Sequence, residues 1–281
     1  MKDDNTSTSQ DLFGIKPFGD ATNAIVNKSL EGIEAFLKLV CAPACEEFGK
    51  LLGDNVRSFR LNNIIRILSK AQGKFEFNEE KLQFKVHPRI ALSIIENGSL
   101  IDNEDLQDMW AGLFVSSCTI NEQSDENLIF IDLLKQLTSC EAKIIKYACE
   151  NAKKILYENG LIIGDDLNIE CKDLINISGV KEIHILDRDL DHLRSLELIG
   201  SVLGGGGFNA SDKNLTADIT PTPLALYMYV KTQGHNFDPK FFWKSNMISI
   251  LEHTAIKEAK QKEEAEKQKL EIEKINALRN Q

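Results

Sequence analysis

The sequence predicts a mainly α-helical protein, with a helical domain, a winged-helix-like C-terminal module, an N-terminal amphipathic helix and a C-terminal charged helical tail. Apolar residues recur at helical spacing through most of the chain, and capping and stop residues mark the ends of the expected helices. Alternation typical of strands gathers around the run Gly204–Gly207. With 281 residues, 42% hydrophobic and 27% charged, the chain can bury an ordinary globular core.

Composition divides the chain into five segments. The start is polar and broken by Gly and Pro, which predicts a flexible leader. The end is rich in Glu, Lys and Ala without a heptad, which predicts an exposed helix that frays. The expected segments are a leader at 1–19, an amphipathic segment at 20–53, a helical region at 54–136, a winged-helix-like module at 137–235 and a C-terminal helix with a charged tail at 236–281.

The segment after Asp20 is predicted to form an amphipathic helix that is kinked, or begins again, at Pro43. Its apolar face carries Ile33, Leu37 and Val40. Its other face carries Glu31, Glu34 and Lys38. A helix over residues 20–42 would be about 34 Å long, which is enough to cross the hydrocarbon of a bilayer.

Three uses of this helix stay open. A single copy makes a poor membrane span, because each charge near the bilayer centre costs about 2.5–3.5 kcal/mol while each Leu, Ile or Phe returns only about 0.3–0.6 kcal/mol. Several copies could instead turn their charges toward a shared water-filled lumen and their apolar faces toward lipid. The other two uses are helix-to-helix oligomerisation in water and plain packing into the core.

The stretch from Val56 to Lys74 predicts a helix with five basic residues and no acidic one. Its basic side chains have three candidate roles: pairing with acidic turns of the chain itself, binding a nucleotide or phosphate, or contacting anionic headgroups. A ligand pocket would use Arg57, Arg60 and Arg66.

Local signals predict the helices that follow. Pro88 opens one helix and Gly98 closes it, and Asn103 caps the next. The wide apolar face around Trp110 on that second helix is interpreted as core. A further helix is expected at about 127–136.

Another helix is expected after an N-cap at Ser139. Four of its apolar residues are expected to point inward: Ile144, Ile145, Ala148 and Ile155. Later in the chain, a short helix is followed by a strand at Leu198–Leu203, a Gly-rich tip, a strand at Leu215–Ile219 and a helix that starts at Thr222, which is a winged-helix outline. We interpret the glycines as a wing tip, since a phosphate loop would lead straight into a helix.

Charge and motif content argue against several functional classes. The net charge of −10 disfavours nucleic acid as a partner, and the helix before the glycine run has only Arg188 and Arg194 against four acidic residues. The chain has no GxSxG, HExxH or Walker loop, so neither an enzymatic activity nor a cofactor is predicted. A zinc site from Cys149, Cys171, His184 and His192 would have irregular spacings, so no metal is predicted.

The expected compartment is the cytoplasm. The six cysteines form no CxxC pair, which fits a reducing environment. The first residues lack the basic and apolar regions of a secretory signal.

Four motifs occur in a recognisable order: "LGDNVRSFRLNNIIRIL", "VHPRIALSIIENGSLIDNEDLQDMWAGLFVSSC", "FIDLLKQLTSCEAKII" and "LDHLRSLELIG". Over about 51–230 the chain resembles the Abi-alpha (abortive-infection alpha) family of bacterial proteins, and the helix around Trp110 is the most specific part of the resemblance. Gly112 and Phe114 depart from the small or aliphatic residues usual there. The resemblance implies a helical domain and a role in bacteriophage defence, and it supplies no catalytic residues.

Together with the N-terminal helix, this resemblance favours an oligomeric anti-phage effector that acts on the inner membrane, as a pore or ion channel, through that helix. It would be restrained by a partner protein such as a nucleotidyltransferase, or by a nucleotide ligand. The alternative is a soluble adaptor or antitoxin-like interaction protein. A DNA-binding regulator that uses the winged helix is the third interpretation.

Overall fold

The computed structural model describes residues 32–33, 35–41, 57–75, 84–120, 124–200, 207–209 and 215–279. Residues 35–41 are helical. The helices that follow are α2 (Arg57–Lys74), α3 (Pro88–Gly98), α4 (Glu104–Ser116), α5 (Leu128–Leu134), α6 (Ser139–Asn151), α7 (Cys171–Ser178), α8 (Ile183–Ser195), α9 (Pro223–Thr232), α10 (Pro239–Trp243) and α11 (Ile250–Arg279). The strands are β1 (Lys154–Leu156), β2 (Ile162–Gly164), β3 (Asn168–Glu170), β4 (Gly207–Asn209), β5 (Thr216–Asp218) and β6 (Met247–Ser249).

The prediction of a mainly helical protein is confirmed, and several helices begin where their sequence signals lie. Pro88 opens α3 and Gly98 closes it. The Asn103 side chain accepts a hydrogen bond from the Leu106 backbone N–H at 3.1 Å, which caps α4 as expected. The cap of α6 is Thr138 rather than Ser139, because Thr138 and Glu141 form a reciprocal capping box.

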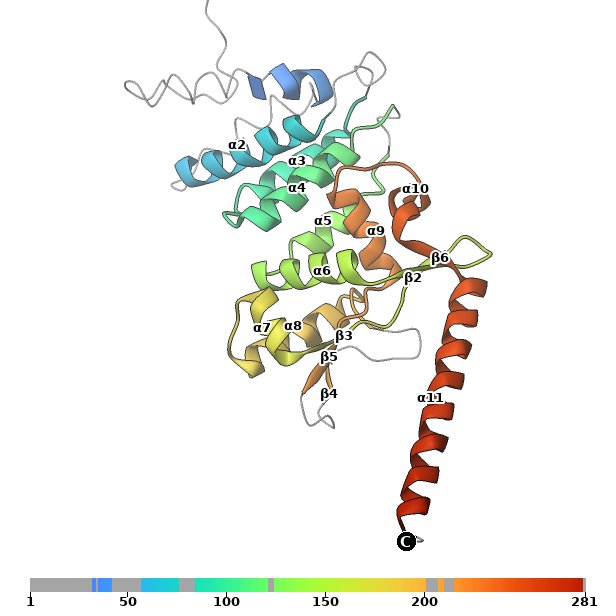
Figure 1. Ribbon diagram of the computed structural model, residues 1–281. Helices are drawn as coiled ribbons and strands as arrows, with labels where there is room; N and C mark the ends of the chain where they lie inside the picture. Colours follow the sequence, from blue (N-terminus) through green and yellow to red (C-terminus); the bar gives the residue numbers. More distant parts are fainter. Residues whose placement is uncertain are drawn as a thin grey trace, which may run out of the picture.

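Helix α4 is the centre of the fold. It packs against α2, α3, α5, α6 and α9, and every residue from Met109 to Ser116 is buried. In Figure 1, α2, α3 and α4 form the upper part of the body, α7 and α8 form the lower part, and α5, α6 and α9 lie between them. The interpretation of Trp110 as a core residue is confirmed, since its side chain is fully buried.

The approach of α9 to α4 is unusually close at Gly112. A Cβ atom at this position would lie 1.6 Å from the backbone oxygen of Thr232 and 2.3 Å from its carbonyl carbon. These are backbone atoms that cannot turn away, so only glycine allows the two helices to meet here. The Gly112 that departs from the family pattern is therefore required by this packing.

Two small sheets of three strands each lie between the helices. In the order β2-β1-β6, β1 is antiparallel to β2 and parallel to β6, with Ile155 opposite Ile248. The expectation that Ile155 lies on a helix is wrong, because α6 ends at Asn151 and Ile155 is buried within β1. Parallel pairing with β6 ties the C-terminal part of the chain back to its middle.

The second sheet has the order β3-β5-β4 and packs with α7 and α8. The strand expected at Leu215–Ile219 is confirmed as β5. Of the strand expected at Leu198–Leu203, the described residues show only a bridge from Ile199 to Pro221, and β4 begins instead at Gly207. Gly204 to Gly206 lie outside the described residues.

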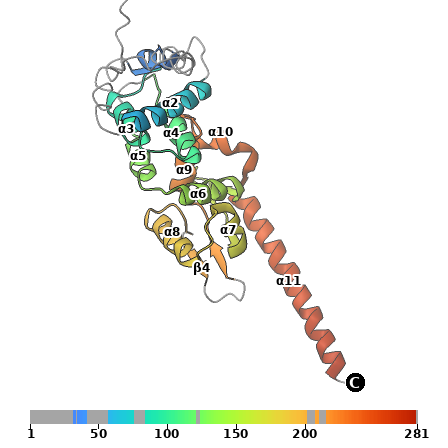
Figure 2. The ribbon, with the colours of Figure 1, turned by 90° about the vertical axis from the view of Figure 1, so that its left-hand side faces the viewer.

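Helix α11 projects away from the body, as Figures 1 and 2 show from two directions. The side chains from Thr254 to Lys269 are all exposed. At its base, His253 Nε2 lies 3.0 Å from the Asp165 carboxylate, and Lys257 pairs with the same group at 3.5 Å. Local pairs such as Lys267 with Glu263 support the projecting part.

The contact between α4 and α9 can be tested with matched glycine substitutions. We expect Gly112→Ala to lower the free energy of unfolding by about 3 kcal/mol or more, because the methyl group forces the two helices apart. Gly73→Ala is the control, since Gly73 lies in α2 and nothing comes within 4 Å of its added Cβ; it is expected to be neutral or slightly stabilising. Equal thermal midpoints for the two variants would contradict this account of the packing.

Candidate functional site

The described part of the N-terminal helix lies against the body of the protein. The three residues expected on its apolar face are buried: Ile33 and Leu37 are each 1% exposed and Val40 is 0% exposed. Phe36 joins them, with its ring 5.6 Å from that of Phe75 in an edge-on contact and 5.9 Å from that of Phe114. In this conformation the apolar face therefore meets the protein's own core.

The end of this helix is also tied down by hydrogen bonds. The Val86 backbone N–H donates to the Val40 carbonyl at 2.9 Å, and the Lys85 ammonium group donates to the Leu39 carbonyl. Lys85 in turn pairs with Thr119 through two backbone hydrogen bonds of 2.8 Å. These contacts satisfy carbonyl groups that the end of a helix would otherwise leave open.

The polar face is only partly visible. Lys38 is exposed, whereas Glu31, Glu34 and Pro43 lie outside the described residues, so the expected kink does too. No helix in the described ranges combines the length and the apolar character needed to cross a bilayer.

Helix α2 does not bring Arg60 and Arg66 together. Arg60 donates from Nε to the Ser99 hydroxyl at 3.0 Å, while Arg66 is exposed. Six residues separate them, which places them about 120° apart around the helix axis. The Arg57 side chain lies outside the described part. A single pocket that uses both Arg60 and Arg66 is therefore not formed.

Acidic residues of α4 neutralise the other end of α2. The Lys70 ammonium group lies 2.9 Å from the Asp108 carboxylate and 3.5 Å from that of Glu104. Burial lowers the pKa of Lys70, but the hydrogen bond and the charge of Asp108 outweigh it, and the pKa ends above its ordinary value. Internal pairing of the basic helix is thus observed at Lys70.

Two of the four residues of the possible zinc site, His192 and Cys149, have other partners in the structure. His192 Nδ1 lies 2.6 Å from the buried Glu141 carboxylate, which links α8 to the cap of α6. The Cys149 thiol is buried and donates to the Ala225 carbonyl at 3.6 Å. Burial raises the pKa of Cys149 to about 12, so the thiol is protonated at neutral pH. Within the described ranges, no three His, Cys, Asp or Glu side chains gather as a metal site would require.

Helix α8 offers little positive charge to DNA. Arg188 binds the buried Asp189 carboxylate at 2.6 Å, and Arg194 pairs with Asp191 at 2.5 Å. Both guanidinium groups are therefore neutralised by their own helix.

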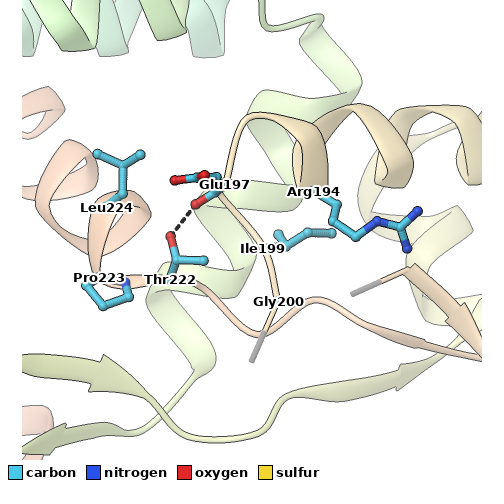
Figure 3. Close-up of a pocket in the computed structure, with 7 residues that line it drawn as sticks. All are labelled: Arg194, Glu197, Ile199, Gly200, Thr222, Pro223 and Leu224. Carbon is cyan, nitrogen blue, oxygen red and sulfur yellow. Dashed lines mark hydrogen bonds between the residues drawn. The ribbon is translucent and has the colours of Figure 1, made fainter. Parts of the chain in front are cut away.

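Two hollows share Pro223 and Leu224 at the start of α9. The first, of about 440 Å³, lies between the end of α8 and the start of α9, and Figure 3 shows Thr222 donating to the Glu197 carbonyl within it. Glu197 has a positive φ of 58°, which is strained for a residue other than glycine. The Arg194 side chain extends away from Thr222 in Figure 3 and is paired elsewhere, so none of the described residues that line this hollow offers a cation to an anionic ligand.

The second hollow, of about 360 Å³, is named here the Trp243 hollow. Its lining is largely apolar and includes Leu161, Ile162, Leu224, Leu226, Tyr227, Pro239 and Trp243. The Trp243 ring stacks on Tyr229 at 5.6 Å, and the buried Lys154 ammonium group lies 4.1 Å from the Trp243 ring centroid. This site was not predicted from the sequence, although "DPKFFWK" places three aromatic residues directly after an Asp-Pro helix start.

Lys154 also links Trp243, at the floor of this hollow, to the end of α6. Its ammonium group donates to the carbonyls of Cys149 and Ala152, the second at 2.7 Å. Positive charge at the C-terminal end of a helix is stabilising. Burial nevertheless lowers the pKa of Lys154 to about 8, with the nearby Glu150 carboxylate as a smaller opposing influence.

The relation of this fold to known proteins comes from one comparison. The profile of the family described as "Abortive infection alpha" matches residues 60–209, which is more than half of the chain. The chain belongs to the abortive infection alpha family. Neither the curated proteins nor the solved structures include a significant match.

The part shared with the abortive infection alpha family is the helical body. The match begins in α2 and ends in β4, so it includes α4 with its buried Trp110. The N-terminal helix, the Pro223–Trp243 side of the second hollow and α11 lie outside the matched residues. Family membership therefore confirms the predicted resemblance for the body of the protein and carries no information about these flanking elements.

The buried lysine gives a pH-dependent prediction. Since the pKa of Lys154 is about 8 in the folded chain and 10.5 ordinarily, the unfolded chain binds more protons between these values, and stability rises with pH across this window. Relative to Lys154→Met, the native chain should gain roughly 3 kcal/mol in its free energy of unfolding from below pH 8 to above pH 10.5. Denaturant unfolding at several pH values measures this, and parallel stability curves for the two proteins would refute it.

Proposed function

We propose that this chain is an anti-phage effector of abortive infection, which arrests or kills an infected bacterial cell before the phage matures. Membership of the abortive infection alpha family, over residues 60–209, is the observation that carries the proposal. We further propose that the chain acts without catalysis. Charged side chains that lie close together, such as Glu141 and His192, pair with each other inside the protein.

The N-terminal helix is the element that we propose to act on the inner membrane. In its docked position Ile33, Phe36, Leu37 and Val40 are hidden from water, and each such side chain contributes about 1.5–3 kcal/mol. Release into water would forfeit that energy. Release into a bilayer would not, because lipid hides the same face from water. The docked helix is thus a restrained form for which a membrane is the favoured destination.

Any interaction that stabilises the N-terminal helix in its docked position would restrain it from entering the membrane. Its ring contact is with Phe75, the residue directly after α2, the helix that carries Arg60 and Arg66. A partner protein, such as a nucleotidyltransferase, or a nucleotide bound at α2 would therefore act on the docking surface itself. We propose that loss of this partner or ligand during infection releases the helix, and that several copies then shield its charges from lipid.

A second candidate is a soluble adaptor or antitoxin-like interaction protein. Burial of the whole apolar face at Ile33, Leu37 and Val40 favours it, because a helix used only for core packing would look the same. A winged-helix module formed by α6–α8 with β3–β5 would then serve as structure. Its use as a DNA-binding regulator has less support, since both arginines of α8 are paired with its own acidic residues.

One substitution separates these candidates without changing the N-terminal helix. Phe75→Ala removes the edge-on partner of Phe36 just after the end of α2, and such a truncation costs about 3–5 kcal/mol. If the helix is a restrained membrane element, the released population should rise roughly a hundredfold. Purified Phe75→Ala should then release dye from inner-membrane-like liposomes much faster than the native chain does.

Phe130→Ala is the matched control, because Phe130 is equally buried but contacts Tyr227 instead of Phe36. It should lower stability without raising leakage. Equal, low leakage from all three proteins would reject the membrane mechanism and favour the adaptor.

A further inference from the structure

The Trp243 hollow has the size and the lining of a small-molecule site. Its volume of about 360 Å³ is typical of ligand pockets, and its walls are mainly apolar. Leu161 and Ile162 line it from the start of β2, Leu224 and Leu226 from α9, and Trp243 from α10. Such a hollow suits a compact ligand with a flat apolar body.

Trp243 brings a hydrogen-bond donor to this hollow. Its side chain is 5% exposed, and its indole Nε1–H makes no hydrogen bond within the described residues. The Lys154 ammonium group and the Tyr229 ring contact the faces of the indole, so its edge, which carries Nε1, is the part left to line the hollow. Most buried donors in folded proteins have a partner, so this one favours a ligand that carries a hydrogen-bond acceptor.

A cation lies at the edge of the hollow. The Lys240 ammonium group lies over Gly160, a lining residue, where an added Cβ would be only 2.8 Å from its Nζ atom. Gly160 also has a φ of 89°, a conformation that favours glycine. Among the described residues, Lys240 forms no ion pair. Asp238 lines the hollow too, but it caps α10 by accepting a hydrogen bond from the Lys240 backbone N–H at 2.9 Å.

We propose that the Trp243 hollow binds a small carboxylic acid whose flat, largely apolar body carries a hydrogen-bond acceptor. The carboxylate pairs with the Lys240 ammonium group at the edge, the body packs against the leucines of α9, and the acceptor receives the Trp243 Nε1–H. A nucleotide fits this site poorly, because several phosphate charges would meet one ammonium group and the Asp238 carboxylate. This inference goes beyond the proposed function and does not depend on it, since binding is measured on the purified chain without phage or membrane.

The two tryptophans of the chain make the test specific. Proton–nitrogen NMR spectra of the isotope-labelled full chain contain one indole N–H signal from Trp243 and one from Trp110, which is fully buried in α4; Trp243→Phe identifies them. The probe is cinchoninate, a quinoline carboxylate whose ring nitrogen lies opposite its carboxylate. It should shift the Trp243 signal in a saturable way and leave the Trp110 signal in place.

Two analogues separate the polar contacts of the probe. Lepidine has a methyl group in place of the carboxylate, and naphthoate has a carbon in place of the ring nitrogen. Each should bind about tenfold more weakly than cinchoninate, because each loses one of the two polar contacts.

Lys240→Met tests the cation at the edge of the hollow. It should weaken cinchoninate binding about tenfold and leave lepidine binding unchanged. Lys181→Met is the matched control, because Lys181 is an exposed lysine between α7 and α8, and it should change neither affinity. An unaltered spectrum outside the hollow verifies that both variants are folded. A Trp243 signal that stays in place at millimolar cinchoninate, equal shifts of both indole signals, or equal binding of cinchoninate and lepidine would each overturn the proposal.

Discussion

The close contact of α4 with α9 is the constraint on which the rest of the structure depends. Because Gly112 has no side chain, the backbone of α9 at Thr232 can lie directly against α4. The same α4 carries Phe114, which contacts the N-terminal helix through Phe36, and the same α9 carries Tyr229, on which Trp243 stacks. One contact between two buried helices therefore fixes the docking surface of the N-terminal helix and the floor of the Trp243 hollow.

Much of the helical framework could be predicted because its signals are local. Asn103 marks a helix start through a hydrogen bond made three residues along the chain, and Pro88 suits a first turn because its missing N–H needs no partner there. The strands were harder, since each has three residues and shows no periodicity. β1 pairs with β6 across about ninety residues of chain, and Lys154, a charged residue, is fully buried within it. No local pattern reports such long-range partners.

The candidate sites were predictable only in part, for two physical reasons. Helical spacing identified the apolar face of Ile33, Leu37 and Val40, but protein core and lipid both accept such a face, so the pattern cannot choose between them. Composition identified the basic character of α2, but not that Arg60 and Arg66 lie on different sides of it. The Trp243 hollow arises where α9, α10 and the turn before β2 converge, and no single stretch of sequence contains it.

The parallel pairing of β6 with β1 has a mechanical consequence for α11. This helix leaves the body directly after Ser249, and its described ion pairs with the body lie near its base, at His253 and Lys257, so it acts as a stiff lever about 45 Å long. Any sideways force on its far end is carried first by the short β6–β1 ladder. The force then acts on Lys154 in β1. Its ammonium group donates a hydrogen bond to the Ala152 carbonyl at the end of α6 and lies over the Trp243 ring. A force on the far end of α11 therefore acts on the residues of the Trp243 hollow before it acts on α4.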